Sequence, residues 1–209
     1  MKRTLFFATI LLFLGAFGLR ADEVANGNGH IDVVEGSLAI LNQKVPARLV
    51  IDFSNTRVVE FGKKDAVDKD CGPILEYLAS KGEDYLADWE PMKKDLQAHC
   101  EGRFAKRNKM YIDNANAQYE VKIVVDQLDF GDTTARVFLS FHEEGGVVFS
   151  GKVIITDLSN GETLGVVNVV WMKGKDTNSY NYSEAHAVCF TFGNTFLDKF
   201  LFRKANKEK

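Results

Sequence analysis

Apolar and polar residues alternate along a long stretch in the second half of the chain. The run from Tyr119 to Val125 has the two-residue period of a strand with one buried face, and the period returns over 137–141, 147–155 and 164–167. The connections between these stretches are too short for the crossover helices that parallel strands need. We therefore expect four consecutive antiparallel strands, a C-terminal four-strand meander.

Glycine-containing sequences mark two turns of this meander. Glu144-Gly145-Gly146 supplies residues that tolerate positive φ between two alternating stretches. Asn160-Gly161 lies between two further apolar stretches, and this dipeptide predicts a tight type I′ hairpin.

Shorter apolar runs precede this region. Ile31 to Glu35 and Arg48 to Phe53 predict two more strands, because Gly36, Asn42 and Pro46 punctuate the space between them. Two further segments are less sharply defined by their residues. Ser37 to Leu41 fits either a strand or a turn, and Arg57 to Phe61 either extends a strand or begins another.

The period changes to that of a helix after Pro73. A first helix is predicted from Ile74 to the residue before Gly82. A longer amphipathic helix follows, ending at Asn108, with apolar residues three and four positions apart: Tyr85, Leu86, Trp89, Met92, Leu96, Cys100 and Phe104. Pro91 implies either that this helix begins near 88–90 or that it kinks there.

Ser183 is suited to cap a last helix, whose apolar residues cover about half of its circumference. One interpretation wedges this helix between the sheet and the helix that contains Trp89. The other leaves Phe190, Leu197 and Leu201 partly exposed as a stripe that binds a partner.

The order of elements is strands, helices, strands and a helix, which predicts an α+β fold with helices packed on one face of a largely antiparallel sheet. We expect one domain over 31–205 and a polar tail over 206–209, since the chain is short for two domains.

The N-terminus has the pattern of a secretory signal peptide over 1–21. Lys2 and Arg3 precede an apolar stretch from Leu5 to Leu19, which at about 15 residues falls short of the ~20 that span a bilayer. Cleavage is expected after Ala21, with Ala16 and Gly18 as the alternative site. The glycine-rich residues 22–30 then form a flexible leader. The mature chain is expected to have no transmembrane span and to lie in the periplasm or outside the cell, associated with the envelope.

The chain is mildly acidic, with a net charge of -3 and no basic run longer than two lysines. It lacks the clustered basic residues that are typical of a nucleic-acid-binding protein.

Cys71, Cys100 and Cys189 allow at most one internal disulfide. Cys71 to Cys100 is the first choice because these residues flank one helical region. The alternative is three buried, reduced thiols.

No catalytic motif, phosphate-binding loop or familiar metal-ligand spacing occurs in the sequence. A mixed site from His99, Cys100, His186 and Cys189 is conceivable, but both cysteines belong to apolar helix faces. We assign no catalytic residue, no metal and no cofactor. Tyr180, Asn181 and Tyr182 lie in a polar loop whose aromatic and amide groups suit recognition of a partner.

Several short motifs resemble a family of uncharacterised secreted and envelope proteins of Bacteroidota: Gly36-Ser37-Leu38 with Leu41, Leu49 leading to Asp52-Phe53-Ser54, Trp89, and Ala117-Gln118-Tyr119. The turn at Asp157-Leu158 and Gly161-Glu162-Thr163-Leu164 also resembles one in bacterial envelope accessory lipoproteins, whose small domains bind other proteins. This chain lacks their lipid-attachment cysteine, and no functional residue carries over.

These observations favour an exported, non-catalytic binding or assembly protein of the cell envelope, whose partner is another envelope protein or a second copy. A protein that encloses a small apolar ligand or a lipid is the alternative. A hydrolytic enzyme without a recognisable motif is the third.

Overall fold

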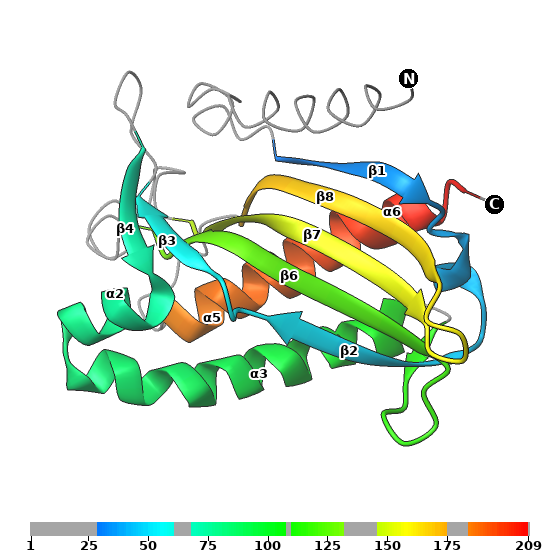
Figure 1. Ribbon diagram of the computed structural model, residues 1–209, viewed down its shortest axis with the longest axis horizontal. Coiled ribbons are helices and arrows are strands. Elements are labelled where there is room, and N and C mark those ends of the chain that lie inside the picture. The colour runs from blue at the N-terminus through cyan, green and yellow to red at the C-terminus, as the bar shows by residue number, and fades with distance from the viewer. Residues whose placement is uncertain (1–28, 61–67, 108–109, 132–145, 175–183, 209) are drawn as a thin grey trace, which may run out of the picture.

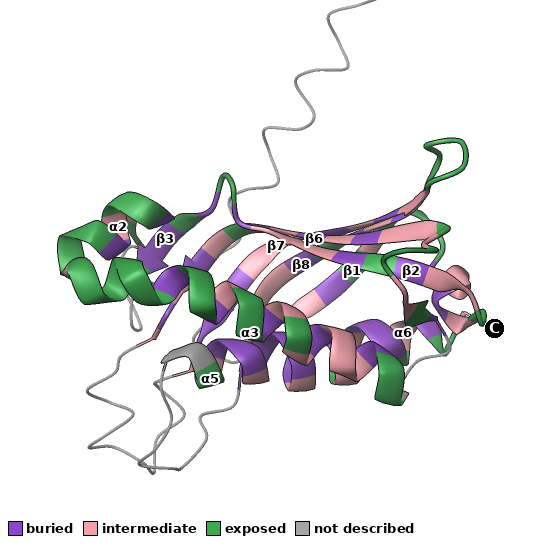
Figure 2. Ribbon diagram, turned by 90° about the horizontal axis from the view of Figure 1, so that it is seen from below, coloured by how far each residue is buried: buried purple, intermediate pink, exposed green. Residues whose placement is uncertain are grey.

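A mixed sheet of eight strands forms the front layer of the computed structural model, and the helices cover its back (Figures 1 and 2). The structure describes residues 29–60, 68–107, 110–131, 146–174 and 184–208. The fold is therefore α+β with helices on one face, as the sequence predicts. The signal peptide predicted over 1–21 lies outside the described residues.

The elements follow one another in a simple order. The first part of the chain contains β1 (His30–Gly36), the 3₁₀ turn η1 (Ala39–Asn42), β2 (Pro46–Asp52), β3 (Arg57–Glu60), β4 (Lys69–Pro73), α2 (Ile74–Lys81) and α3 (Glu83–Arg107). The second part contains β5 (Tyr111–Ile112), β6 (Tyr119–Asp129), β7 (Val148–Asp157), β8 (Thr163–Lys173), α5 (Glu184–Cys189), the π-helical segment η2 (Phe190–Leu201) and α6 (Phe202–Ala205).

β6, β7 and β8 form an antiparallel meander, and β1 adds to β8 in the same antiparallel sense. The strand predicted over 137–141 lies outside the described residues. Because β6 is hydrogen-bonded directly to β7 from Tyr119 to Asp129, the described meander has three strands.

The other half of the sheet contains parallel pairs, which the sequence pattern does not predict, beside the antiparallel pair of β3 and β4. β2 pairs in parallel with both β5 and β6, and β3 pairs in parallel with β6. The chain between β2 and β6 includes α2 and α3, and these helices supply the long crossover that parallel neighbours require.

The β7–β8 hairpin is confirmed, but its turn is not the type I′ turn that Asn160-Gly161 predicts. Type I′ needs positive φ at both central residues, and only Gly161, with φ +77°, has it in this turn. The Asp157 carboxylate accepts hydrogen bonds from the Ser159 N–H at 2.8 Å and the Ser159 hydroxyl at 2.6 Å. These local bonds stabilise a wider loop, which the Gly161 N–H closes by donating to the Asp157 carbonyl at 2.8 Å.

The two predicted early strands are β1 and β2, and the segment from Arg57 is β3. Ser37 to Leu41, which the sequence left open, leads into the turn η1. At the other end of the chain, the Glu208 carboxylate accepts hydrogen bonds from the Leu38 N–H at 2.6 Å and the Ser37 hydroxyl at 2.9 Å. The polar tail is thus tied to the start of η1 through Glu208.

α3 runs without a break through Pro91 and begins at Glu83, earlier than 88–90. Pro91 removes one backbone donor, which would otherwise bond the carbonyl of Ala87. Both residues are exposed, so solvent can take the place of the missing donor.

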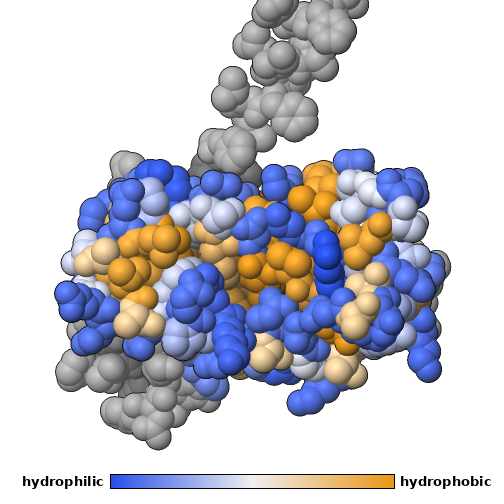
Figure 3. All heavy atoms as spheres, turned by 60° about the horizontal axis from the view of Figure 1, so that its bottom comes forward, coloured by the Kyte–Doolittle hydropathy of each residue, from blue (hydrophilic) through white to orange (hydrophobic). Residues whose placement is uncertain are grey.

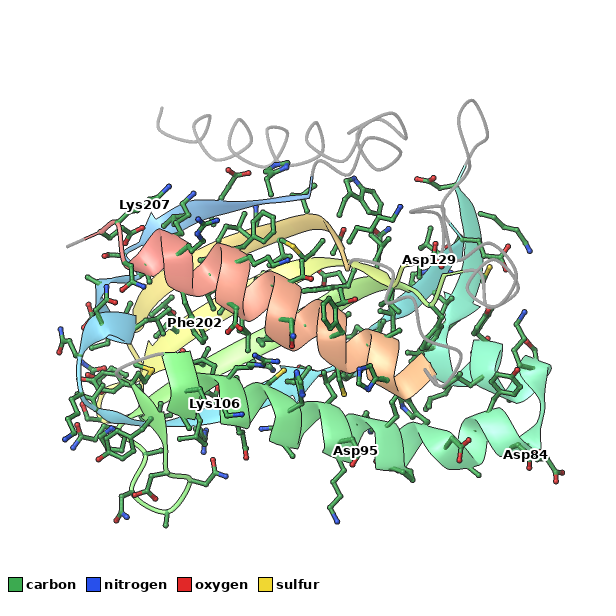
Figure 4. The ribbon with its side chains drawn as sticks, turned by 180° about the vertical axis from the view of Figure 1, so that it is seen from behind. Asp84, Asp95, Lys106, Asp129, Phe202 and Lys207 are labelled. Carbon is green, nitrogen blue, oxygen red and sulfur yellow. The ribbon has the colours of Figure 1, made fainter. Side chains whose placement is uncertain are left out.

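α5, η2 and α6 form one continuous rod that lies on the back of the sheet, side by side with α3 (Figure 4). The Phe192 ring stacks on Phe149 of β7 at a centroid distance of 4.0 Å, and Phe196 meets the same ring edge-on at 5.3 Å. These aromatic contacts fill the layer between sheet and rod.

Candidate functional site

The stripe of Phe190, Leu197 and Leu201 is not the exposed partner surface that the sequence offered as one interpretation. Leu197 and Leu201 have 0% exposure and Phe190 is partly buried. Apolar residues cover about half of the circumference of this helix because it packs against two neighbours. One is the sheet, and the other is α3 beside it. Leu197 and Leu201 therefore belong to the core, as the wedged-helix interpretation has it.

A polar seam of four residues joins α3 to η2 within this packing. His99 Nε2 lies 3.1 Å from Asn194 Oδ1, which also accepts a hydrogen bond from Arg103. Arg103 pairs in turn with Asp198 at 3.1 Å. The two helices can approach this closely because residue 193 is glycine. A Cβ at that position would collide with the His99 ring. The seam fixes the position of the rod along α3.

Burial lowers the pKa of His99 in this seam, although its bond to Asn194 opposes the shift. His99 donates from Nε2 to the amide oxygen of Asn194, and this bond holds the neutral imidazole between α3 and η2. The arrangement suits a structural histidine.

All three cysteines are free thiols, so the predicted Cys71–Cys100 bridge is not formed. Cys100 is fully buried on α3, whereas Cys71 is partly exposed on β4. Burial strongly raises the pKa of Cys100 and raises that of Cys189 to about 11. Thiols in such surroundings behave as small apolar side chains.

The described residues contain no group of three or more His, Cys, Asp or Glu side chains placed to hold a metal ion. Within the same ranges, no helix is both long and apolar enough to cross a bilayer. Tyr180, Asn181 and Tyr182 lie outside the described residues, so their role in recognition stays a prediction.

The largest group of exposed apolar side chains lies where two helices extend beyond the sheet. We define the overhang as α2 together with the first turns of α3, residues 83–88. Every residue from Glu83 to Asp88 is exposed, and Trp89 is the first buried residue of α3 (Figure 2). Leu75, Tyr85 and Leu86 are 54%, 46% and 42% exposed. Figure 3 shows apolar surface at this end of the molecule.

The overhang is anchored by its inner side. Tyr77 of α2 stacks on Phe130 at 6.1 Å with ring planes 9° apart, and the Lys81 ammonium lies 4.8 Å from the Tyr77 ring centroid. Ile74 and Leu78 are buried. The exposed leucines thus belong to a helix pair that is held in place by other residues.

Carboxylates border the apolar residues of the overhang: Glu76, Glu83, Asp84 and Asp88. Acidic residues in the first turn of a helix also compensate its dipole, and Glu83 and Asp84 occupy that turn of α3. The overhang combines apolar area with negative charge.

The opposite end of the molecule carries exposed apolar and basic side chains. Figure 4 places Asp84 at one end and both Lys106 and Lys207 at the other. Tyr111 and Leu158 are 40% and 36% exposed there, beside the starts of β2 and β6.

Exposed cations gather near this second end, where α3 and α6 finish: Lys106, Arg203 and Lys207. Carboxylates of this end already have hydrogen-bond donors within the chain. Glu208 bonds Leu38, Asp157 bonds Ser159, and Asp113 bonds Asn116. The donors are neutral groups, so these carboxylates keep their negative charge, and the three cations lie among them.

Helical spacing puts Tyr85 and Leu86 in one apolar pattern with the buried residues Trp89 and Met92. The first turns of α3 nevertheless extend beyond the sheet, so Tyr85 and Leu86 are exposed (Figure 2). The four carboxylates around them are the one sequence signal that this part of the helix pair is solvated.

No family model matches this chain, and neither does any curated protein. Its fold is similar to that of the PelC dodecamer from Paraburkholderia phytofirmans, with TM-score 0.38, 11% identity, and coverage of 76% of this chain and 89% of that one. It is also similar to a protein from Xanthomonas campestris, with TM-score 0.35, 11% identity, and coverage of 75% and 82%. Function must therefore be argued from the residues of this chain.

Proposed function

We propose that this protein is an exported, non-catalytic binding and assembly protein of the bacterial cell envelope, and that the overhang is its contact surface. The exposure of Leu75, Tyr85 and Leu86 on one rigid helix pair carries the proposal. Large apolar side chains grouped on a surface and bordered by charges are typical of protein interaction sites. The signal-peptide pattern of the first 21 residues supports export.

The occupant that best fits the overhang is the opposite end of a second copy. That end offers Tyr111 and Leu158 to the apolar residues, and Lys106, Arg203 and Lys207 to the carboxylates. The three cations favour this orientation, and the carboxylates of the overhang disfavour the approach of two overhangs, which would bring like charges together.

The two surfaces lie at opposite ends of the same chain, so the contact is heterologous. Such a contact repeats from copy to copy and produces a ring where the rotation closes, or a filament where it does not.

Sedimentation velocity of the mature chain over a range of concentrations tests the proposal. We expect the wild type to form species larger than one chain, and the variant Leu86→Asp to stay a single chain with an unchanged circular dichroism spectrum. Asn168→Asp is the control, since it adds a carboxylate on the exposed middle of the sheet. A wild type that remains a single chain at every concentration contradicts the second copy as occupant. In that case, binding of an envelope protein that Leu86→Asp abolishes would reassign the surface to another partner.

A further inference from the structure

Trp171 has a backbone conformation that is unfavourable for a bulky side chain. Its φ is +49°, and it is the only residue other than glycine with positive φ in the described ranges. The left-handed region of backbone conformation, with positive φ, costs an L-amino acid roughly 1 to 2 kcal/mol. Such strain is typically found where a side chain must be held in a particular place.

A β-bulge produces this conformation. Phe149 of β7 pairs with Met172 and Gly151 pairs with Val169, so Ser150 faces two residues of β8, Val170 and Trp171. The Trp171 N–H donates to the Ser150 hydroxyl at 3.0 Å instead of to a ladder carbonyl.

A second bulge lies at the same level on the other side of β7. Val125 of β6 pairs with Gly151 and Gln127 pairs with Ser150, which leaves Asp126 as the extra residue. The strands approach so closely here that a Cβ at Gly151 would collide with the Val124 carbonyl oxygen. Two bulges therefore flank Ser150.

Both bulges place two successive side chains on the face of the sheet that none of the described helices covers, the face that Figure 1 shows. Val169 and Met172 are buried against the helices, so Val170 and Trp171 between them lie on the other face of the strand, where both are partly buried. Val125 and Leu128 are buried in the same way, so Asp126 and Gln127 face outward too. Ser150 lies between these two pairs.

Further polar residues surround this group on neighbouring strands. Lys152 pairs with Asn168, and Asn168 also pairs with Asp32, which forms an ion pair with His30 at 3.1 Å. With strands about 4.8 Å apart, the distance from β8 to β6 is roughly 10 Å, the length of two sugar rings.

Asp126 differs from Asp52, a carboxylate on the neighbouring strand β2 that pairs in register with Val124 of β6. Asp52 pairs with Lys122 at 2.6 Å, and this bond, with help from Ser54, lowers the pKa of Asp52 to about 2. The pKa of Asp126 is instead raised, because burial by neighbouring atoms outweighs the attraction of Lys152. Asp126 is nevertheless an exposed residue, so a ligand that donates hydrogen bonds can reach it.

We infer that the bulged region around Trp171, with Asp126, Gln127, Ser150 and Asn168, binds a polyhydroxylated ligand, the chemistry of a carbohydrate chain. An indole offers a flat apolar surface to the C–H face of a sugar ring. Carboxylate, amide and hydroxyl groups match hydroxyls, which donate and accept hydrogen bonds. An anionic ligand is disfavoured by Asp126 and Asp32, and a purely apolar one by the desolvation of these polar groups.

Saturation-transfer NMR with cellotetraose, maltotetraose and chitotetraose, each at millimolar concentration, tests this site. We expect at least one to bind the wild type and Trp171→Ala to lose that binding. Asp126→Asn should weaken the affinity about tenfold, the loss of one hydrogen bond to a charged acceptor. Val34→Ala is the control, because it removes an exposed apolar side chain of β1 that belongs to neither this site nor the overhang, and it should bind normally.

Intrinsic fluorescence supplies a second readout, since the chain has two tryptophans. Trp89 is buried against Phe53 at 5.1 Å, so a saturable change on adding the bound sugar must come from Trp171. Binding of none of the three sugars overturns the inference, as does unchanged affinity in Asp126→Asn. The Asp126 variant keeps the test independent of whether Trp171→Ala folds.

Discussion

Arg103 of α3 and Asp198 of η2 form an ion pair at 3.1 Å whose side chains are only 20% and 16% exposed. The pair belongs to the seam that also contains His99 and Asn194, in the middle of an otherwise apolar contact between two helices. A charged pair in such a place defines how the helices align, because a shift of either helix would separate two poorly solvated charges.

Arg103→Met should therefore destabilise the protein by about 3 kcal/mol, because Asp198 loses its guanidinium while staying largely buried. Urea unfolding of the two proteins measures this. The double variant Arg103→Met with Asp198→Leu removes both charges and should recover most of the loss. A single variant as stable as the wild type would show that the seam does not hold the rod.

Acid should weaken the fold through His99. Burial lowers its folded-state pKa below the unfolded value of 6.5, so the unfolded chain takes up the proton first as the pH falls. The stability from neutral His99 is complete above pH 6.5 and is lost as the pH falls from there through the lowered pKa. Urea unfolding at a series of pH values should show this slope, and His99→Gln should flatten it. Equal slopes in both proteins would contradict the assignment.

A leucine-to-aspartate change at two positions distinguishes core from surface. Leu197→Asp buries a carboxylate at a position with 0% exposure and should prevent folding, whereas Leu86→Asp, at 42% exposure, should change the unfolding midpoint little. Circular dichroism and urea unfolding measure both variants. A folded Leu197→Asp protein would restore the exposed stripe that the sequence allowed.

The cysteines should differ in reactivity toward a thiol reagent without denaturant. Partly exposed Cys71 should react even though desolvation raises its pKa too, while Cys100 and Cys189 should be protected by their burial. Mass spectrometry after alkylation under native conditions counts the modified residues. Absence of label at Cys71 and Cys100 together with a mass that fits a disulfide would show that the bridge forms after all.

The fold class was predictable because the signals were local. The alternation from Tyr119 to Val125 and the helical spacing after Pro73 depend on which face of an element is buried, and the described strands and helices follow them. Parallel pairing of β2 with β6 depends on where α2 and α3 carry the chain, which no window of sequence records.

The candidate contact surface was not predictable for a related reason. Leu86 and Trp89 belong to the same apolar pattern on α3, three positions apart. Only Trp89 lies over the sheet and is buried. Trp171 likewise lies in an ordinary apolar stretch, and its positive φ arises only from the register of β7 against β8. Burial at these positions depends on where neighbouring elements end, which is a property of the assembled fold.

A mixing experiment tests the end-to-end contact most directly. Leu86→Asp blocks the overhang and leaves the opposite end intact, while Leu158→Asp blocks the opposite end and leaves the overhang intact. Each variant alone should sediment as a single chain, and an equimolar mixture should form dimers and nothing larger, because only one functional contact remains. A mixture that stays monomeric, or either variant assembling by itself like the wild type, would contradict the contact between Leu86 of one copy and Leu158 of the next.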